Sequence, residues 1–234
     1  MFTLNEQLWA LYTAYAEDMC AADQNEKMRI LRCSLKNCYQ SLPLWLTYLT
    51  ELERTADSGD LSTLEQVVEQ AKQQIGEGHP DKQFELDKFW HGALQRSVAA
   101  DSADKESVEQ KISRLREFYE AKFIELTQLQ DRSRLTQWIQ LQAQAEATRI
   151  GDMQALTQLM DVYCKSQGQS FESWLTYIGL VKLADLRLGS FPKNVRSTYK
   201  RGVTQFCKQD KAKLAKSWLT FEQQAGSASS IQEC

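Results

Sequence analysis

Six tryptophans recur along this chain of 234 residues at intervals that indicate a repeat architecture. Three residues after a tryptophan comes an apolar or aromatic residue each time, and nearly the same string returns as WLTY, WLTY and WLTF. Residues i and i+3 lie on one face of a helix, so each tryptophan is expected to lead an amphipathic helix. The repeat units therefore start near Trp9, Trp45, Trp90, Trp138, Trp174 and Trp218, at intervals of 36, 45, 48, 36 and 44 residues.

Glycine followed by a capping residue recurs after the tryptophan segments, which predicts a second helix in each unit. Glycine suits the left-handed position that ends a helix, and Asp or Ser suits the N-cap of the next one. Ser62 and Glu65 match a capping box, and Pro192 suits a first helical turn. The glycine pairs are Gly59-Asp60, Gly151-Asp152, Gly189-Ser190 and Gly226-Ser227.

The expected fold is all-α, because only 3 Pro and 10 Gly interrupt a chain rich in helix-forming residues. We expect a right-handed α-solenoid of antiparallel helix pairs over residues 1–234, with all six tryptophans substantially buried. No window is apolar enough to span a membrane and no signal segment is recognisable, so an intracellular protein is expected. The six cysteines form no CxxC pair, which favours reduced thiols. The expected helices are 3–18, 23–38, 42–56, 60–75, 85–99, 104–130, 133–148, 152–166, 171–187, 192–208 and 211–225.

The two-helix units and their Trp-x-x-Tyr start resemble the half-a-tetratricopeptide, or HAT, repeat of RNA-processing proteins. The segment from Val195 to Val203 matches the second helix of that repeat best, with Arg196, Tyr199 and Arg201 in the family's order. Other units depart from the pattern, since Cys33 stands in place of the later arginine and Ala93 in place of the tyrosine.

The order of features along the whole chain resembles the C-terminal HAT subdomain of factors that recycle the U4 and U6 small nuclear ribonucleoproteins. That resemblance implies a nuclear scaffold for mRNA splicing that forms a homodimer and recruits spliceosomal proteins and ubiquitin-specific proteases. The RNA-recognition domains that follow such arrays are absent from the sequence, which predicts a segment of a longer protein. A HAT scaffold of another pre-mRNA processing complex, of the 3′-end cleavage or U1 type, is the alternative.

No residue pattern predicts catalysis, a cofactor or a metal. The tryptophans and tyrosines are expected in the core, and Glu17, Glu53, Glu146 and Arg201 are expected to join helices by hydrogen bonds. The two histidines, His79 and His91, have no cysteine or carboxylate at zinc-ligand spacing, and no nucleophile or phosphate-binding motif is present. A non-catalytic interaction protein is the expectation.

Positive charge is concentrated in residues 182–216, which contain ten basic residues and two acidic ones. This segment carries +8 and the rest of the chain −11, so the segment can attract an acidic protein surface. RNA is the second possibility, although interleaved aromatic residues for base stacking are sparse there. The expected contacts are Lys193, Lys200, Lys208 and Lys211.

Two apolar segments predict self-association. The helix from Phe171 to Leu188 is apolar on almost every side, so a stripe with Leu180 and Leu183 needs a neighbour beyond its own helix pair. The last helix, with Leu214 and Phe221, has no following helix in this sequence. A second copy of the chain is the expected cover for both.

Overall fold

The computed structural model describes residues 2–19, 24–55, 61–99, 105–205 and 208–225, and within these ranges the chain is helical, which confirms the all-α prediction. None of the helices among the described residues is long and apolar enough to cross a membrane. The elements are α1 (Phe2–Met19), α2 (Gln24–Asn37), α3 (Leu42–Thr55), α4 (Ser62–Ile75), α5 (Pro80–Ala99), α6 (Lys105–Gln128), α7 (Arg132–Ala145), a π-helical turn (Glu146–Ile150), α8 (Met153–Ser166), α9 (Phe171–Leu188), α10 (Lys193–Gln205) and α11 (Lys208–Ala225).

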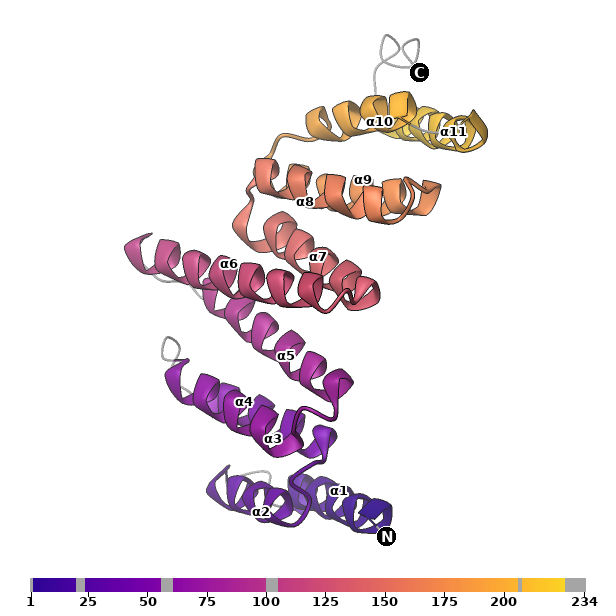
Figure 1. The fold of residues 1–234 in the computed structure, drawn as a ribbon. Helices are drawn as coiled ribbons and strands as arrows, with labels where there is room; N and C mark the ends of the chain where they lie inside the picture. The colour runs from indigo at the N-terminus through magenta and orange to yellow at the C-terminus, as the bar shows by residue number, and fades with distance from the viewer. Residues whose placement is uncertain (1, 20–23, 56–60, 100–104, 206–207, 226–234) are drawn as a thin grey trace. The chain divides into compact units, whose positions relative to one another are not determined.

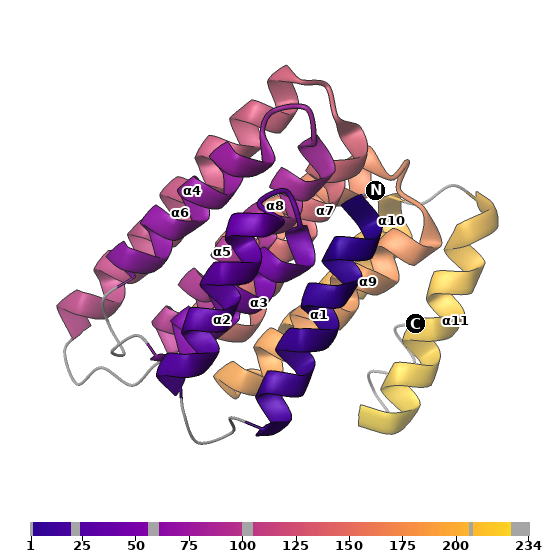
Figure 2. The same ribbon diagram turned by 90° about the horizontal axis from the view of Figure 1, so that it is seen from below.

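The chain divides into two compact units, Met1–Ser107 and Val108–Cys234. In the first unit α1 packs on α2, α2 on α3, α3 on α4 and α4 on α5. In the second unit, which contains most of α6, the same succession runs from α7 to α11. Figure 1 and Figure 2 show the paired helices running alongside each other within each unit. Helices that follow one another in sequence are therefore neighbours in space, as the repeat pattern predicts.

Two helices begin earlier than the sequence pattern indicates. α5 begins at Pro80, where a missing N–H costs nothing, and the amide of Gln83 donates to the carbonyl of His79 at 3.1 Å. α11 begins at Lys208. Trp90 and Trp218 consequently lie in the middle of their helices and not near the start.

The turn at Gly151 has the predicted form. Gly151 adopts a left-handed φ of 88°, and the Asp152 carboxylate accepts from the amides of Gln154 and Ala155, both at 3.0 Å. At α4 the prediction is displaced by one residue, because Leu61 occupies the N-cap position and Ser62 already lies in the first turn. The pairs Gly59-Asp60 and Gly226-Ser227 lie outside the described residues.

At Gly189 the C-terminal glycine is confirmed, with a φ of 67°, but Ser190 is not the N-cap of α10. The Asp185 carboxylate of α9 accepts from the amides of Asn194 at 3.0 Å and Val195 at 3.1 Å. The Ser190 hydroxyl donates to the same carboxylate at 2.7 Å. Asp185 is fully buried near the end of α9. Its side chain therefore caps the first turn of α10 from the preceding helix.

Five of the six tryptophans are buried as predicted, and Trp9 is the exception. Trp45, Trp90, Trp138, Trp174 and Trp218 are at most 7% exposed. Trp9 is half-buried, because α1 packs chiefly against α2 and leaves Tyr12, on the same face, 46% exposed. Five tryptophans are therefore fully buried, and burial at the first repeat is only partial.

The second unit contains the same aromatic arrangement twice. The ring of Tyr119 stacks on Trp138 with centroids 6.2 Å apart and planes 4° apart, and Tyr199 stacks on Trp218 at 6.2 Å and 5°. In both places the tyrosine comes from one helix and the tryptophan from the next, so each stack joins two helices. These offset stacks are the centre of the packing between helix pairs.

Gly202, in the interior of α10, permits the closest contact in the core of the second unit. A Cβ atom there would lie 2.7 Å from Leu214 Cδ2 and 2.9 Å from the Trp174 ring. We expect Gly202→Ala to lower the free energy of unfolding by about 1 to 3 kcal/mol, because overpacking outweighs the better helix propensity of alanine. Urea unfolding measures the change. Gly179→Ala is the matched control, since nothing lies within 4 Å of its added carbon, and it should be neutral or stabilising. Equal stability of the two variants would contradict the contact.

Candidate protein-interaction surfaces

A buried ion pair fixes α6 to the π-helical turn. The Arg116 guanidinium donates to both carboxylate oxygens of Glu146, at 3.1 and 3.0 Å, and also to Asp152 at 2.9 Å. Gln142 donates to Glu146 at 3.0 Å, and the Glu146 side chain is 1% exposed. The hydrogen bond to Glu146 raises the pKa of Arg116. Glu146 thus joins helices, as predicted, and does not face solvent as a reactive carboxylate.

The same type of pair recurs between α10 and α11, at a glutamate that the sequence reasoning missed. Arg196 donates to both oxygens of Glu222, at 2.8 and 3.0 Å, and Trp218 Nε1 donates to Glu222 at 3.2 Å. Glu222 follows its tryptophan by four residues, whereas Glu146 follows Trp138 by eight. A search at one spacing alone could not find both, although both positions lie on the same helix face as the tryptophan.

Two further charged residues have the predicted joining role. Arg201 donates to Asp161 at 2.7 Å and to the Tyr177 hydroxyl, and its guanidinium lies over the ring of Tyr177. In the first unit Arg96 donates to both oxygens of Glu53, at 2.7 and 2.8 Å. The side chain of Glu17 lies outside the described residues. These charged side chains join helices to each other within a unit. The candidate interaction surfaces are therefore formed by other residues.

A strip of leucines on α9 is exposed. Leu183 is 50%, Leu186 55% and Leu188 48% exposed, and Leu175 lies about two turns before Leu183 at 37%. Leu180, which was expected on the same surface, is half-buried and packs against the core of the second unit. We call Leu175, Leu183 and Leu186 the leucine strip.

Leu214 and Phe221 are not available to a partner, contrary to the expectation. They are 0% and 9% exposed, because α10 and α9 cover this face of α11. Phe221 also contacts the rings of Phe191 and Tyr199. The exposed apolar residue of α11 is Leu219, at 36%.

Three of the four expected lysine contacts are exposed. Lys193, Lys200 and Lys211 are exposed and have no ion-pair partner among the described residues. The side chain of Lys208 is outside the described residues. Arg196 and Arg201 are held in the ion pairs above, so the free positive charge of residues 182–216 is smaller than the sequence indicates.

The second unit has an apolar groove that the sequence reasoning did not identify. It encloses about 380 Å³ between α6 and α8, over α7. Its apolar walls are formed by Tyr119, Phe123, Ile124, Leu159 and Val162. We call it the α6/α8 groove. The sequence signal was the presence of Ile124 and Val162 on helix faces away from the tryptophans, where the pattern predicts polar residues.

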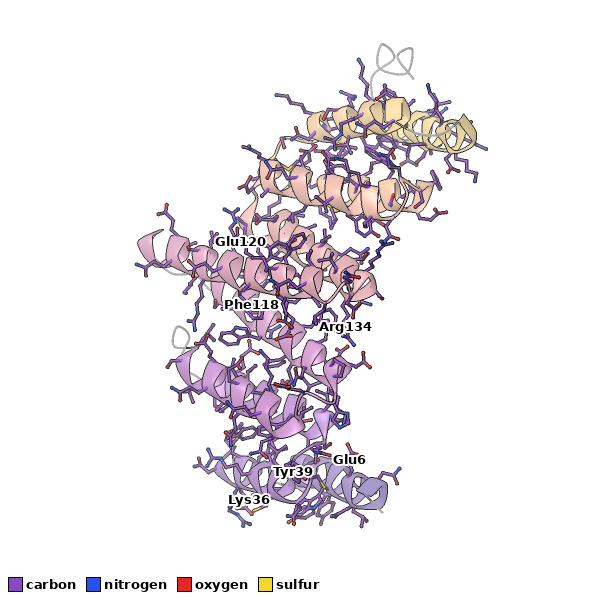
Figure 3. All side chains as sticks on the ribbon, in the orientation of Figure 1. Glu6, Lys36, Tyr39, Phe118, Glu120 and Arg134 are labelled. Carbon is purple, nitrogen blue, oxygen red and sulfur yellow. The ribbon has the colours of Figure 1, made fainter. Side chains whose placement is uncertain are left out.

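The first unit has a hollow at the corresponding place, between α2 and α4 over α3, with different chemistry. It measures about 410 Å³ and is lined by Arg32, Lys36, Tyr39 and Tyr48 among others. Arg32 donates to the Tyr48 hydroxyl at 3.2 Å. Lys36 and Tyr39 lie at the carboxyl end of α2 in Figure 3. The two units therefore present unlike surfaces at equivalent positions.

Comparison with protein-family models finds no match to this chain, and comparison with curated proteins finds none either. Among the residues that the structure describes, no three His, Cys, Asp or Glu side chains are grouped as metal ligands would be. His91 is 1% exposed, and burial raises the pKa of the Cys164 thiol to about 11. The exposed surfaces of the described residues are therefore the candidate interaction sites.

Proposed function

We propose that the chain is a non-catalytic scaffold of HAT repeats, arranged as a right-handed α-solenoid, that binds proteins and a second copy of itself. The observation that supports this most is the repeated frame of the second unit, in which an Arg-x-x-Tyr helix is fixed to a tryptophan helix by a ring stack and a buried ion pair. A frame of this kind holds exposed apolar residues in fixed positions, which suits protein recognition.

The scaffold would act in mRNA splicing in the nucleoplasm, in the recycling of the U4 and U6 small nuclear ribonucleoproteins. Its partners would be spliceosomal ribonucleoprotein components and ubiquitin-specific proteases. These partners come from the resemblance to HAT repeats. The carboxylates at repeat positions, Glu53, Glu146 and Glu222, are in ion pairs, which supports a role in packing over a role in catalysis.

Direct RNA binding through residues 182–216 is the second candidate, supported by the exposed Lys193, Lys200 and Lys211. Two observations favour a protein partner over RNA. Arg196 and Arg201 are held in ion pairs, and Tyr199, the aromatic residue of α10, is 5% exposed and cannot offer its ring to a base.

Capture from a nuclear extract tests the proposed function. The immobilised chain should enrich U4 and U6 RNAs over U1 RNA, and protease treatment of the extract should abolish that enrichment because proteins mediate it. Enrichment of U1 RNA alone would favour the alternative pre-mRNA complex. Binding of protein-free U6 RNA at physiological ionic strength would favour the RNA-binding candidate.

The leucine strip is the proposed self-association surface. We expect Leu183→Glu combined with Leu186→Glu to weaken self-association by at least about 100-fold, because two buried leucines contribute about 1.5 to 3 kcal/mol each. Sedimentation velocity over a concentration series measures the effect. Leu129→Glu is the control, since Leu129 is 64% exposed at the end of α6. An unchanged dissociation constant for the double variant would exclude the strip as the interface.

A further inference from the structure

The α6/α8 groove combines an apolar interior with exposed apolar edges. Ile124 on α6 is 56% exposed and Val162 on α8 is 46% exposed, and both line the groove. Phe123 and Leu159, which lie deeper, are half-buried. An aliphatic or aromatic side chain placed between α6 and α8 would cover all four.

A tyrosine hydroxyl without a hydrogen-bond partner lies at this groove. Tyr119 lines the groove, its side chain is more than nine-tenths buried, and its hydroxyl oxygen is shielded from solvent with no partner among the described residues. Tyr199, which is stacked on its tryptophan in the same way, has its hydroxyl 3.2 Å from Ser217 Oγ. Gln137 precedes Trp138 where Ser217 precedes Trp218, so the serine hydroxyl that partners the tyrosine in the second copy is replaced by another side chain in the first.

A buried hydroxyl that finds no acceptor is unfavourable, so an acceptor brought by a binding partner has an energetic reason to reach it. Burial also raises the pKa of Tyr119, which keeps the hydroxyl protonated as a donor. Because the hydroxyl is shielded in the free chain, a backbone carbonyl of a bound segment accepts from it once binding moves aside the side chains that cover it.

The rim of the groove is acidic. Glu120 lines the groove, and a second hollow of about 580 Å³ that shares Glu120 and Arg116 is also lined by Glu109 and Glu117. These three glutamates are exposed on α6 and have no ion-pair partner among the described residues. Figure 3 shows Glu120 on α6. Arg116, the basic residue shared by the two hollows, is engaged by Glu146 and Asp152.

We propose that the α6/α8 groove binds a short basic segment of a partner protein. An aliphatic or aromatic residue of the segment enters between α6 and α8, a neighbouring lysine or arginine meets Glu117 and Glu120, and a backbone carbonyl accepts from the Tyr119 hydroxyl. The acidic rim repels RNA, which makes a protein segment the occupant. This inference rests on the proposed scaffold function and names the kind of segment that one of its surfaces binds.

Selection from a random library of displayed peptides about 12 residues long, on the whole chain, identifies the segment. We expect enriched peptides to carry Leu, Ile or Phe next to Lys or Arg. Fluorescence anisotropy with an enriched synthetic peptide then gives its affinity. Ile124→Asp with Val162→Asp should weaken binding at least about tenfold. Leu11→Asp should leave binding unchanged, because Leu11 is 68% exposed on α1 and belongs to neither proposed surface. Glu117→Lys with Glu120→Lys should weaken binding of the basic peptide. It should strengthen binding of a version that has acidic residues in place of the basic ones.

Tyr119→Phe separates a binding role from a structural one. Removal of the unpartnered hydroxyl should raise the melting temperature of the free chain by a few degrees, while the peptide binds roughly 3- to 10-fold more weakly for want of the donor. Tyr199→Phe is the control, because it loses an existing hydrogen bond and should lower the melting temperature with no effect on the peptide.

Three results would overturn the inference. These are the absence of any enriched peptide, enrichment of acidic peptides, and affinity that neither the Ile124 and Val162 changes nor Tyr119→Phe alters. Failure of the proposed function would look different, since the capture of U4 and U6 RNAs or self-association could be lost while the purified chain still bound the basic peptide. Conversely, capture could persist in the Ile124 and Val162 variant, which would remove the groove and retain the scaffold.

Discussion

Replacing Trp174 by alanine is expected to lower the free energy of unfolding by about 3 to 5 kcal/mol. The Trp174 side chain is 1% exposed, and the groups packed around it cannot all move into the space that its loss would leave. Its ring is stacked on Tyr177 with centroids 5.6 Å apart, and the Arg201 guanidinium lies 5.8 Å above it. The ring also lies close to the α10 backbone at Gly202, where a larger residue would collide with it. The cavity left by alanine would lie between α9 and α10, the two helices of one repeat unit.

Guanidinium unfolding followed by circular dichroism measures this loss, and Trp9→Ala is the matched control. Trp9 is the one half-buried tryptophan, so its replacement should cost roughly half as much or less. Trp45, which is 4% exposed, should behave like Trp174. A loss below about 1 kcal/mol for Trp174→Ala would mean that the tryptophan is not a core residue of its repeat.

Replacing Arg116 by methionine is expected to cost about 2 to 3 kcal/mol, because it leaves a buried carboxylate without its cation. The loss is smaller than for a fully buried pair, since the Arg116 side chain is 38% exposed. Glu146 is 1% exposed and would keep Gln142 as its remaining side-chain donor among the described residues. The additional change Glu146→Leu should recover much of the loss, since a buried ion pair can be exchanged for apolar residues of similar volume. The non-additivity of the two changes gives the coupling of α6 to the π-helical turn.

Arg54→Met is the control for this ion pair. The Arg54 side chain is 61% exposed, and its 3.0 Å contact with Glu51 should contribute less than about 1 kcal/mol. Equal losses for Arg116→Met and Arg54→Met, or no recovery in the double variant, would contradict a buried, helix-joining role for Glu146. Chemical denaturation at neutral pH measures the comparison on five proteins, which are the unaltered chain, Arg116→Met, Glu146→Leu, their double variant and Arg54→Met.

Helix positions were predictable because the 3.6-residue periodicity and the capping residues are local properties of the sequence. The boundaries of α9 and α8 agree with the pattern to within about two residues, and the Gly151 turn has the expected geometry. Burial was less predictable, because it depends on which neighbours are present. Trp9 lies on α1, which packs chiefly against α2, and is half-buried, whereas Phe221 is covered by α9 and α10 and is buried.

The surfaces that carry the functional argument were predictable only in part. Leu183 and the exposed lysines could be identified, because a stripe opposite the core-facing stripe is visible in one helix. The α6/α8 groove could not, because its walls come from residues about 40 positions apart, Tyr119 on α6 and Leu159 on α8. The absence of a hydrogen-bond partner for the Tyr119 hydroxyl is likewise a property of the space between helices. It is recognised by comparison with Tyr199, whose hydroxyl is paired with Ser217.

Self-association of the scaffold is tested most directly by the mass of the chain in solution. Size-exclusion chromatography with light scattering, at micromolar to tens of micromolar concentration, should give twice the 26.9 kDa of one chain. The same measurement on the Leu183→Glu and Leu186→Glu double variant should give the mass of one chain. A mass of one chain for the unaltered protein at every concentration would contradict the proposed homodimerising scaffold.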